Sequence, residues 1–183
     1  MLLYLVRHAH AVSEEQDAAR PLSTRGIEYT QRLAEFFKQS GTFAPVQVWH
    51  SPLRRSRETA EILIRELNLD CGMVETSDLR PEDDPKETAA RLSGLMGVEP
   101  LAIVGHEPHL SALATVLVRG KVHPTAFEMK KGAVLALERT DEVHKKSGDP
   151  RWIVTWHLAP ALLPLRPPAA VRRDGGAKNL PTP

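Results

Sequence analysis

The sequence has a single cysteine, almost no net charge and no long apolar run, and each shortage narrows what the protein can be. Cys71 has no cysteine to pair with, so an internal disulfide cannot form. Lys and Arg number 24 against 23 for Asp and Glu, which gives a formal net charge of +1. The overall charge therefore favours neither nucleic acid nor an anionic membrane as a partner, and any preference for anions must be local.

The apolar runs that are present are short. The first, from Leu2 to Val6, has the length of a buried strand and is far too short to span a membrane. No basic and then apolar signal segment precedes it. With one cysteine and no signal segment, we expect the protein to be cytoplasmic.

The composition predicts one domain and a tail. The chain has 183 residues, of which 42% are hydrophobic and 26% are charged, so it can bury one sizeable core. We expect this domain to cover residues 1–163. Residues 164–183 are rich in proline, arginine and glycine and show no apolar periodicity, so they are predicted to be a disordered tail.

Strand-like and helix-like patterns alternate along the predicted domain. Ser23 and Asp84 are typical N-caps, and Gly41 is expected just past the end of the first helix. The alternation predicts an α/β fold with a mainly parallel central sheet and helices on both faces. We expect strands at 2–6, 46–51, within 71–79, and at 100–104, 132–138 and 151–160, and helices at 24–40, 56–67, 85–97 and 108–118.

Polar side chains lie at or just after the carboxyl ends of three predicted strands. Arg7 and His8 follow the first strand, His50 and Ser51 end the second, and His106 follows a later one. The carboxyl ends of parallel strands meet at one edge, where open α/β sheets bind their ligands. Arginine offers phosphoryl oxygens a planar fork of donors, and histidine can act as a nucleophile or a proton carrier. The sequence therefore predicts a pocket for a phosphoryl group.

The remaining histidines and several arginines have plainer interpretations. Four histidines are interpreted as capping or surface residues: His50, His123, His144 and His157. Arg54, Arg55 and Arg57 could form an ordinary solvated helix face. Spacing alone does not say which of the three turns inward.

Four motifs resemble, in order and spacing, those of the histidine phosphatase superfamily. They are RHA at 7–9, RPLSTRG at 20–26, SPLRRSRETA at 51–60 and GHEP at 105–108. The short chain, without a long insert between Arg55 and His106, resembles most the SixA-type phosphohistidine phosphatases, and the closing WHLAP is similar to the last strand of that branch. The resemblance covers residues 1–163 and implies the three-layer α/β/α fold of the phosphoglycerate mutase-like proteins.

The resemblance also implies roles for individual residues. His8 would be the nucleophile, and Arg7, Arg55 and His106 would complete the phosphate pocket. Arg55 is selected because it occupies the arginine position of the family's SP..R pattern, and Thr59 stands at the family's threonine.

Two further residues are assigned to substrate binding, and two others depart from the family's pattern. Arg20, at the arginine of the RPLT pattern, and Ser51 are expected to contact substrate. Ala9 replaces the glycine after the catalytic histidine, which would cost about 1 kcal/mol at a positive φ and almost nothing elsewhere. Glu58 replaces a glutamine and adds a negative charge near an anion site unless it faces an arginine.

The implied activity is hydrolysis through a phosphohistidine on His8, without a metal or other cofactor because the guanidinium groups supply the positive charge. We expect the substrate to be phosphohistidine on a signalling protein, such as a histidine phosphotransfer domain, with small phosphomonoesters as the alternative. Glu82 and Asp83 are the candidate general acids, while Asp84 is expected to cap a helix. A phosphohistidine leaves as an imidazole that can depart neutral, so it depends less on such an acid.

Two other classes stay open. His8, His10, His106 and His109 supply four imidazoles that a zinc hydrolase could use. Against this, no Asp-His pair follows His10, and Pro108 disfavours the helix that an HExxH-type site requires. A non-catalytic module that binds phosphorylated ligands would keep the arginines but would not need both His8 and His106.

Overall fold

The computed structural model describes residues 1–163, in which the predicted order of strands and helices is confirmed. The strands are β1 (Leu2–Arg7), β2 (Gln47–His50), β3 (Gly72–Glu75), β4 (Leu101–Gly105), β5 (Val134–Val143) and β6 (Pro150–Leu158). The helices are α1 (Thr24–Ser40), α2 (Arg54–Leu67), α3 (Pro85–Ser93) and α4 (His109–Arg119), and two 3-10 turns are η1 (Ser77–Leu79) and η2 (Pro160–Leu162).

The strands form one sheet in the order β3-β2-β4-β1-β5-β6. β3, β2, β4 and β1 are parallel, and Arg7 lies beside Gly105 while His50 lies beside Val104, so the carboxyl ends of β1, β2 and β4 are level. β5 and β6 run antiparallel to their neighbours. The sheet is therefore mixed, which corrects the expectation of a mainly parallel one.

The direction of β5 follows from the segment before it. A strand parallel to β1 would have to begin at the amino end of β1, but residues 120–133 bring the chain to its carboxyl end, where Val134 pairs with Val6. β5 then forms a hairpin with β6. As a result, the loop that contains Lys131 and Gly132 lies beside the end of β1, where Gly132 N–H donates to Arg7 O.

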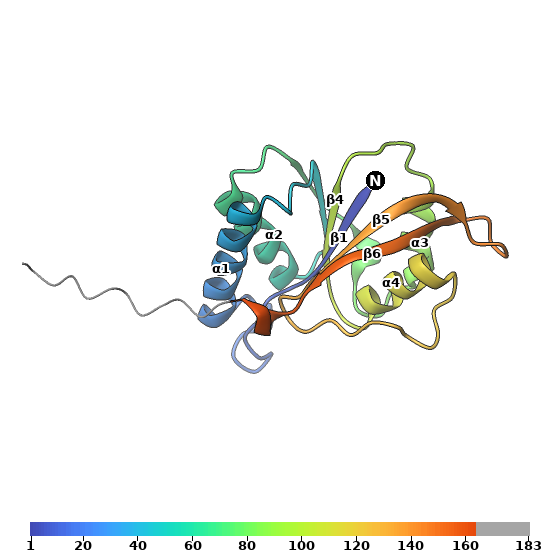
Figure 1. The fold of residues 1–183 in the computed structure, drawn as a ribbon. Helices are drawn as coiled ribbons and strands as arrows, with labels where there is room; N and C mark the ends of the chain where they lie inside the picture. Colours follow the sequence, from blue (N-terminus) through green and yellow to red (C-terminus); the bar gives the residue numbers. More distant parts are fainter. Residues whose placement is uncertain (164–183) are drawn as a thin grey trace, which may run out of the picture.

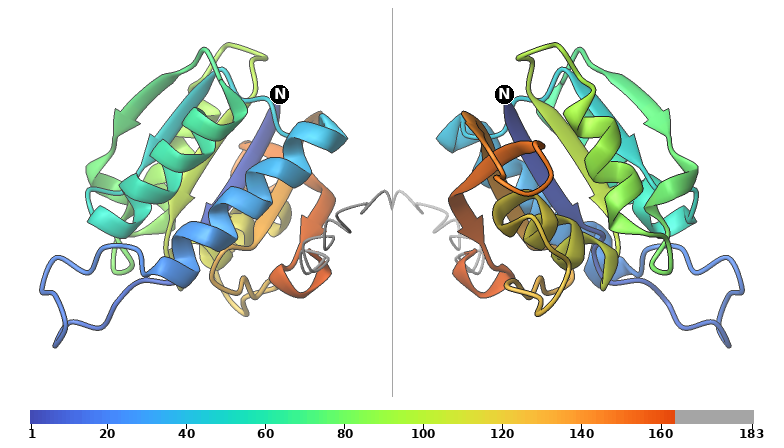
Figure 2. Two further views of the ribbon diagram at one scale, coloured as in Figure 1. Left: turned by 90° about the vertical axis from the view of Figure 1, so that its left-hand side faces the viewer. Right: turned by 90° about the vertical axis from the view of Figure 1, so that its right-hand side faces the viewer.

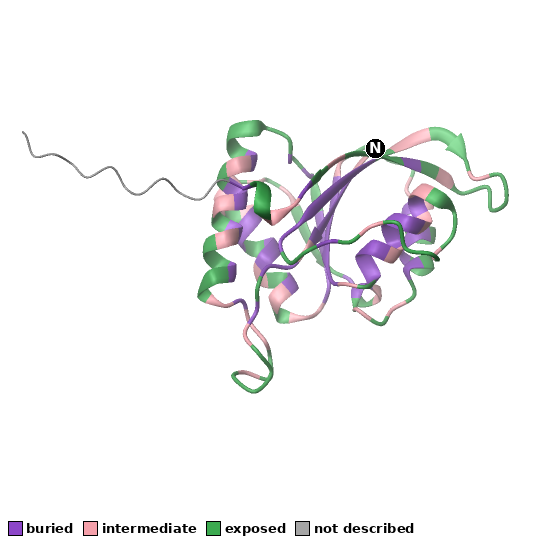
Figure 3. Cartoon of the chain, turned by 60° about the horizontal axis from the view of Figure 1, so that its bottom comes forward, coloured by how far each residue is buried: buried purple, intermediate pink, exposed green. Residues whose placement is uncertain are grey.

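Helices cover both faces of the sheet, as predicted (Figure 1). α1 and α2 pack together on one face, and α3 and α4 pack together on the other. Phe37 and Leu63 belong to the apolar cluster of the first layer, and Leu92 and Leu113 to that of the second. The central strands β1 and β4 are buried between the two layers (Figure 3), so polar groups can be presented only at their ends.

The predicted helix caps are confirmed. Ser23 Oγ accepts a hydrogen bond from Gly26 N–H at the start of α1, and Gly41 takes the left-handed conformation at its end with φ of 65°. Asp84 accepts from Lys86 N–H at the start of α3. These caps fix where both helices begin relative to the strands that precede them.

The predicted end of α3 is wrong by several residues. The helix was expected to continue to Gly97, but it ends at Ser93. The carbonyls of Leu95 and Gly97 accept hydrogen bonds from the Arg139 guanidinium of β5, so they do not need helical partners.

The segment between β1 and α1 extends away from the rest of the domain (Figure 2). A single bridge between Ala11 and Leu22 joins its two ends. Arg20 lies near the second end, with a positive φ of 48°.

The predicted tail, residues 164–183, lies outside the described residues. Within residues 1–163, no helix combines the length and the apolar character that crossing a membrane requires.

Candidate active site

His8 directly follows β1 and is held there by β4 and by the loop before β5. Its N–H donates to Gly105 O at 3.0 Å, its carbonyl accepts from Gly132 N–H at 3.1 Å, and only 6% of the residue is exposed. The ring Nδ1 lies 2.7 Å from Ala9 O. A carbonyl oxygen can only accept, so Nδ1 carries the proton, and the lone pair of a neutral ring is on Nε2.

His106 lies opposite His8, directly after β4. The two ring centroids are 4.8 Å apart, at an interplanar angle of 53°. His106 is 1% exposed, and within residues 1–163 neither of its ring nitrogens has a hydrogen-bond partner. Buried polar atoms are normally paired, so two unpaired nitrogens at a strand end are typical of a site that receives a ligand.

Two arginines complete the group around His8. Arg55, in the first turn of α2, places Nε 3.3 Å from His8 Nε2. Arg7 is fixed by a hydrogen bond from Nη1 to Met129 O of 2.6 Å, while its buried Nε has no partner among the described residues. The structure thus brings together the four residues expected to form the phosphate pocket.

Burial and the arginines keep both histidines neutral. The pKa of His8 is lowered to about 3, mainly by burial and in part by the charges of Arg55 and Arg7, while the hydrogen bond to Ala9 opposes the lowering. The pKa of His106 is lowered to about 2, mainly by burial and in part by His8 and Arg55. A neutral His8 presents a lone pair, which a nucleophile requires.

Thr59 connects α2 to Ala9, the residue after His8. Its hydroxyl donates to Arg55 O at 2.8 Å and accepts from Ala9 N–H at 3.2 Å. Ala9 is 1% exposed and does not have a positive φ, so alanine in place of the family's glycine carries no backbone penalty here.

Glu58, the second departure from the family's pattern, does face an arginine. Its carboxylate accepts from Arg54 Nε at 2.8 Å and from Leu22 N–H at 2.6 Å. The negative charge therefore ties α2 to the segment before α1 and is matched by Arg54.

The two residues expected to contact substrate differ in their environment. Arg20 is half-buried, donates from Nε to Val12 O at 3.4 Å, and lowers the pKa of Arg55, so its charge acts on the phosphate pocket. Ser51 is fully buried, and its hydroxyl accepts from Leu53 N–H at 3.3 Å. Ser51 thus shapes the turn before α2.

The two candidate general acids, Glu82 and Asp83, lie in the loop between η1 and α3 and differ in their contacts. Asp83 accepts from Arg80 N–H at 2.6 Å, and Asp84 caps α3 as expected. Glu82 is exposed, and its charge raises the pKa of Arg55 against the effect of burial. Within residues 1–163, the Asp83 carboxylate has a backbone hydrogen bond and the Glu82 carboxylate has none.

The four histidines of the zinc alternative do not converge. His10 Nδ1 lies 2.8 Å from Ser23 Oγ, and His109 Nε2 lies 3.4 Å from Thr88 Oγ1, so each is held by its own partner. Across residues 1–163, no three His, Cys, Asp or Glu side chains are grouped so that they could bind a metal ion.

The other histidines have the structural positions predicted for them. His50 is buried with Nδ1 2.9 Å from Ser51 O, and His144 Nε2 lies 2.9 Å from Leu117 O. His123 and His157 are exposed.

Two charged residues near the site were not predicted. Lys131, before β5, acts by its charge on His8 and lowers that residue's pKa. Glu107, after His106, is half-buried, and burial raises its pKa while the Arg7 charge opposes the rise. Lys130 and Lys131, just before β5, were the available signal in the sequence. A strand parallel to β1 would begin at the amino end of β1, however, and the expected mainly parallel sheet would therefore have placed these lysines far from His8.

Comparison with known proteins bears on the family. The model of the histidine phosphatase superfamily (branch 1) matches residues 3–81, which include His8, Arg20 and Arg55. The resemblance to the histidine phosphatase superfamily is confirmed. It supports a phosphatase as the class of enzyme. No curated protein matches the sequence.

Solved structures show the same fold. The protein histidine phosphatase SixA, solved with tungstate, has a TM-score of 0.73 at 24% identity, over 88% of this chain and 98% of that one. A protein named as a phosphohistidine phosphatase SixA, from Agrobacterium tumefaciens, has 0.68 at 20%, over 86% and 97%. Mycobacterial glucosyl-3-phosphoglycerate phosphatase has 0.63 at 17%, over 86% and 99%. At these identities the likeness establishes the phosphoglycerate mutase-like α/β fold.

Proposed function

We propose that this protein is a phosphatase that takes the phosphoryl group of its substrate onto Nε2 of His8. The observation that carries the proposal is the tautomer and the position of the His8 ring. Nδ1–H donates to Ala9 O, Nε2 lies 3.3 Å from Arg55 Nε, and the ring centroid of His106 lies 4.8 Å from that of His8. A neutral imidazole fixed in this tautomer aims its lone pair at the place where the arginines would hold a phosphoryl group.

The reaction then has two steps. In the first, the bond from Nε2 to phosphorus forms and the bond to the leaving group breaks, so that its electron pair departs with the leaving group. In the second, water attacks phosphorus, the bond to Nε2 breaks, and its electron pair returns to His8. Arg7, Arg55 and His106 would hold the phosphoryl oxygens in both steps.

The charges of Arg7, Arg55 and Arg20 would balance the phosphoryl group, so the proposed reaction needs no metal. Activity that survives prolonged treatment with EDTA and is inhibited by vanadate would agree with this. Activity that returns only when zinc is added to the dialysed enzyme would contradict it.

For the substrate, we propose phosphohistidine on a protein. An imidazole whose other nitrogen is protonated departs neutral and needs no strong general acid. This suits a pocket in which Glu82 is exposed and Asp83 accepts a hydrogen bond from Arg80 N–H. The likeness to SixA over 98% of that chain agrees with this choice. Small phosphomonoesters are the second candidate, favoured by the Glu82 carboxylate, whose charge acts on Arg55.

One pair of assays separates the two candidates. The wild type and Glu82→Gln are compared on a protein phosphohistidine and on glycerol 3-phosphate, whose alkoxide must be protonated as it leaves. We expect efficient turnover of phosphohistidine, with a change of less than about threefold in Glu82→Gln, because the imidazole needs no strong acid. Rapid turnover of glycerol 3-phosphate that falls by about 100-fold or more in Glu82→Gln would favour the second candidate.

A non-catalytic module that binds phosphorylated ligands is the remaining alternative. It predicts binding of phosphate or vanadate without release of phosphate from any substrate. Turnover that His8→Ala abolishes would exclude it.

A further inference from the structure

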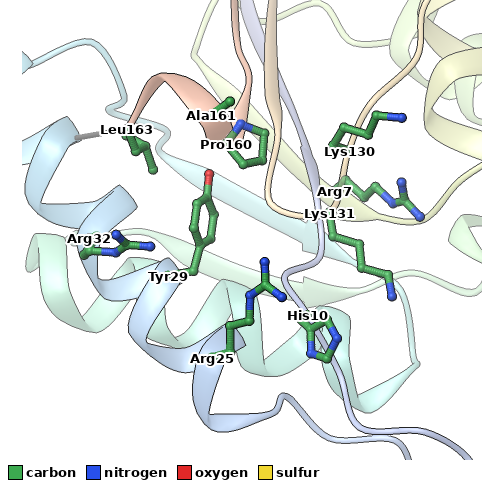
Figure 4. Close-up of a pocket in the computed structure, with 10 residues that line it drawn as sticks. All are labelled: Arg7, His10, Arg25, Tyr29, Arg32, Lys130, Lys131, Pro160, Ala161 and Leu163. Atoms are coloured by element: carbon green, nitrogen blue, oxygen red, sulfur yellow. The ribbon is translucent and has the colours of Figure 1, made fainter. Parts of the chain in front are cut away.

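A cavity of about 790 Å³ opens beside the phosphate pocket, and its lining is strongly basic (Figure 4). Arg7 belongs to both, so the cavity continues directly from the place where the phosphoryl group would bind. We call it the basic groove. Its lining residues are Arg7, His10, Arg25, Tyr29, Arg32, Lys130, Lys131, Pro160, Ala161 and Leu163.

One wall of the basic groove is a single face of α1. Arg25, Tyr29 and Arg32 are spaced at i, i+4 and i+7, which places them in one row along the helix (Figure 4). The rise of seven helical residues is about 10 Å, so the two arginines mark out that length of groove. This is also about the length of three residues of extended polypeptide.

This wall is joined through Gly132 to the backbone of Arg7 and His8. Tyr29 Oη donates to Gly132 O at 3.0 Å, and Gly132 N–H lies 3.1 Å from both Arg7 O and His8 O. Gly132 has a φ of 82°, and a Cβ there would lie 2.2 Å from the Tyr29 ring, so only glycine fits. The groove and the nucleophile are therefore parts of one rigid arrangement.

The positive charge of the basic groove is largely unbalanced. Among residues 1–163, no acidic residue lines it. Lys130 forms an ion pair with Glu128, but among the described residues Arg25, Arg32 and Lys131 form none. Arg32 lies over the Tyr29 ring, with Cζ 5.8 Å from the centroid. Cations held together in this way repel one another unless an anion lies between them.

We propose that the basic groove binds acidic side chains that flank the phosphohistidine of a protein substrate. This inference rests on the proposed function and names the partner of the same site. A row of cations about 10 Å long fits carboxylates spread over several residues of a polypeptide, whereas a three-carbon phosphomonoester has no second anion at that distance. The apolar side chains of Pro160, Ala161 and Leu163 give the backbone of such a segment a surface to lie on.

The test uses two synthetic peptides with one phosphohistidine each. In the first, Asp and Glu occupy the four positions on either side, and in the second, Asn and Gln replace them. The double variant Arg25→Glu with Arg32→Glu is compared with Lys145→Glu with Lys146→Glu. The lysines are exposed in the β5–β6 turn, so this control makes the same change in net charge away from the groove.

We expect the wild type to prefer the acidic peptide by about tenfold or more in kcat/KM. The arginine double variant should lose that preference, while the lysine control keeps it to within about twofold. All proteins should hydrolyse para-nitrophenyl phosphate at similar rates, because that substrate reaches only the phosphate pocket. The same comparison, made as peptide binding to His8→Ala by fluorescence anisotropy, measures the groove without turnover.

Three results would overturn the inference. They are equal binding of the two peptides, equal loss of preference in the lysine control, and an arginine double variant that is impaired only toward a small anionic substrate such as 3-phosphoglycerate. Arg25→Gln with Arg32→Gln, which should retain an intermediate preference, shows that an effect is due to charge and not to misfolding. Failure of the proposed function itself would look different: the wild type would release no phosphate from any substrate, including para-nitrophenyl phosphate.

Discussion

The carboxyl ends of β1 and β2 each present a buried histidine in a similar local arrangement. His8 Nδ1 lies 2.7 Å from Ala9 O, and His50 Nδ1 lies 2.9 Å from Ser51 O, so each ring is fixed by the carbonyl of the next residue. The difference is in what surrounds the rings. His8 has Arg55 at 3.3 Å from Nε2 and a second histidine ring 4.8 Å away.

This comparison shows that a strand end and a fixed tautomer are common to both histidines, so the proposal of His8 as the nucleophile rests on what surrounds its ring. β1 lies between β4 and β5, so residues from both strands and their flanking loops reach His8: His106 from one side and the loop with Lys131 from the other. His50 ends a strand between β3 and β4, and the chain after it turns at once into α2. The position in the sheet therefore brings His106 and Lys131 near His8, and this favours His8 over His50 as the proposed nucleophile.

The largest expected effect separates the two histidines directly. His8→Asn should lower kcat by several orders of magnitude, because the nucleophile, its positioning and the surrounding charge act as one unit. His50→Asn, the matched control at the end of β2, should keep kcat within about threefold once folding is verified by circular dichroism. Steady-state kinetics on phosphohistidine checks both. A loss of activity that is equal in the two variants would remove the distinction between them.

The next effect compares two neighbouring arginines on α2. Arg55→Ala should weaken transition-state stabilisation by about 2–4 kcal/mol, because a charge-assisted contact to the phosphoryl oxygens is lost. Arg54→Ala removes the same charge one residue away but breaks only surface ion pairs, with Glu58 and with Asp17, so kcat/KM should change by less than about twofold. The ratio of kcat/KM values and the inhibition constant of vanadate measure both variants. Equal losses would mean that α2 contributes only general positive charge.

The pH dependence of kcat/KM tests whether His8 is neutral. The pKa of His8 is lowered from the ordinary 6.5 to about 3, mainly by burial, so the neutral nucleophile is present throughout the range from pH 5 to pH 7. Once the ionisation of the substrate is taken into account, kcat/KM should stay level across that range. Arg55→Ala removes a positive charge beside the ring, so the pKa of His8 should rise and the acid limb should move to higher pH.

The same pKa values predict how stability depends on pH. The folded-state pKa values of His8 and His106 lie below those of the unfolded chain, so between about pH 6.5 and 3 the unfolded chain binds more protons. The free energy of unfolding should therefore decrease as the pH falls through this range. His106→Asn should weaken the decrease, measured as melting temperature against pH. A melting temperature of His106→Asn that falls as steeply as that of the wild type would contradict the buried, neutral state.

The smallest expected effect is at Glu58. Glu58→Gln restores the family's usual residue and keeps an oxygen for Leu22 N–H, but it loses the charge that pairs with Arg54. We expect a loss of less than about 1 kcal/mol in stability and no change in kcat/KM. A large gain in activity would show that the Glu58 carboxylate does act on the phosphate pocket.

Much of the site could be predicted because short apolar runs end abruptly in polar residues. Arg7, His8 and His106 follow buried strands, and parallel strands bring such ends together. The choice of Arg55 over Arg54 and Arg57 came from the family's pattern, because spacing alone does not give the orientation of the first turn of a helix.

Other features could not be predicted because they depend on the path of the chain in space. The strand pattern of β5 is the same in either direction, so the mixed sheet, and with it the position of Lys131, follows only from where residues 120–133 lead. The different use of Glu82 and Asp83 depends on a contact with Arg80 N–H that a cluster of acidic residues does not reveal.

The most direct test of the central claim is to find the atom that carries the phosphoryl group. The wild type, mixed with ³²P-labelled substrate and quenched in base within milliseconds, should yield a phosphopeptide with the label on His8, stable in base and labile in acid. His8→Asn should yield no labelled peptide, and His50→Asn should yield the same label as the wild type. Label on His50, on Ser51 or on an aspartate, or phosphate release without any labelled protein when hydrolysis of the intermediate is slowed, would contradict the assignment of His8 as the nucleophile.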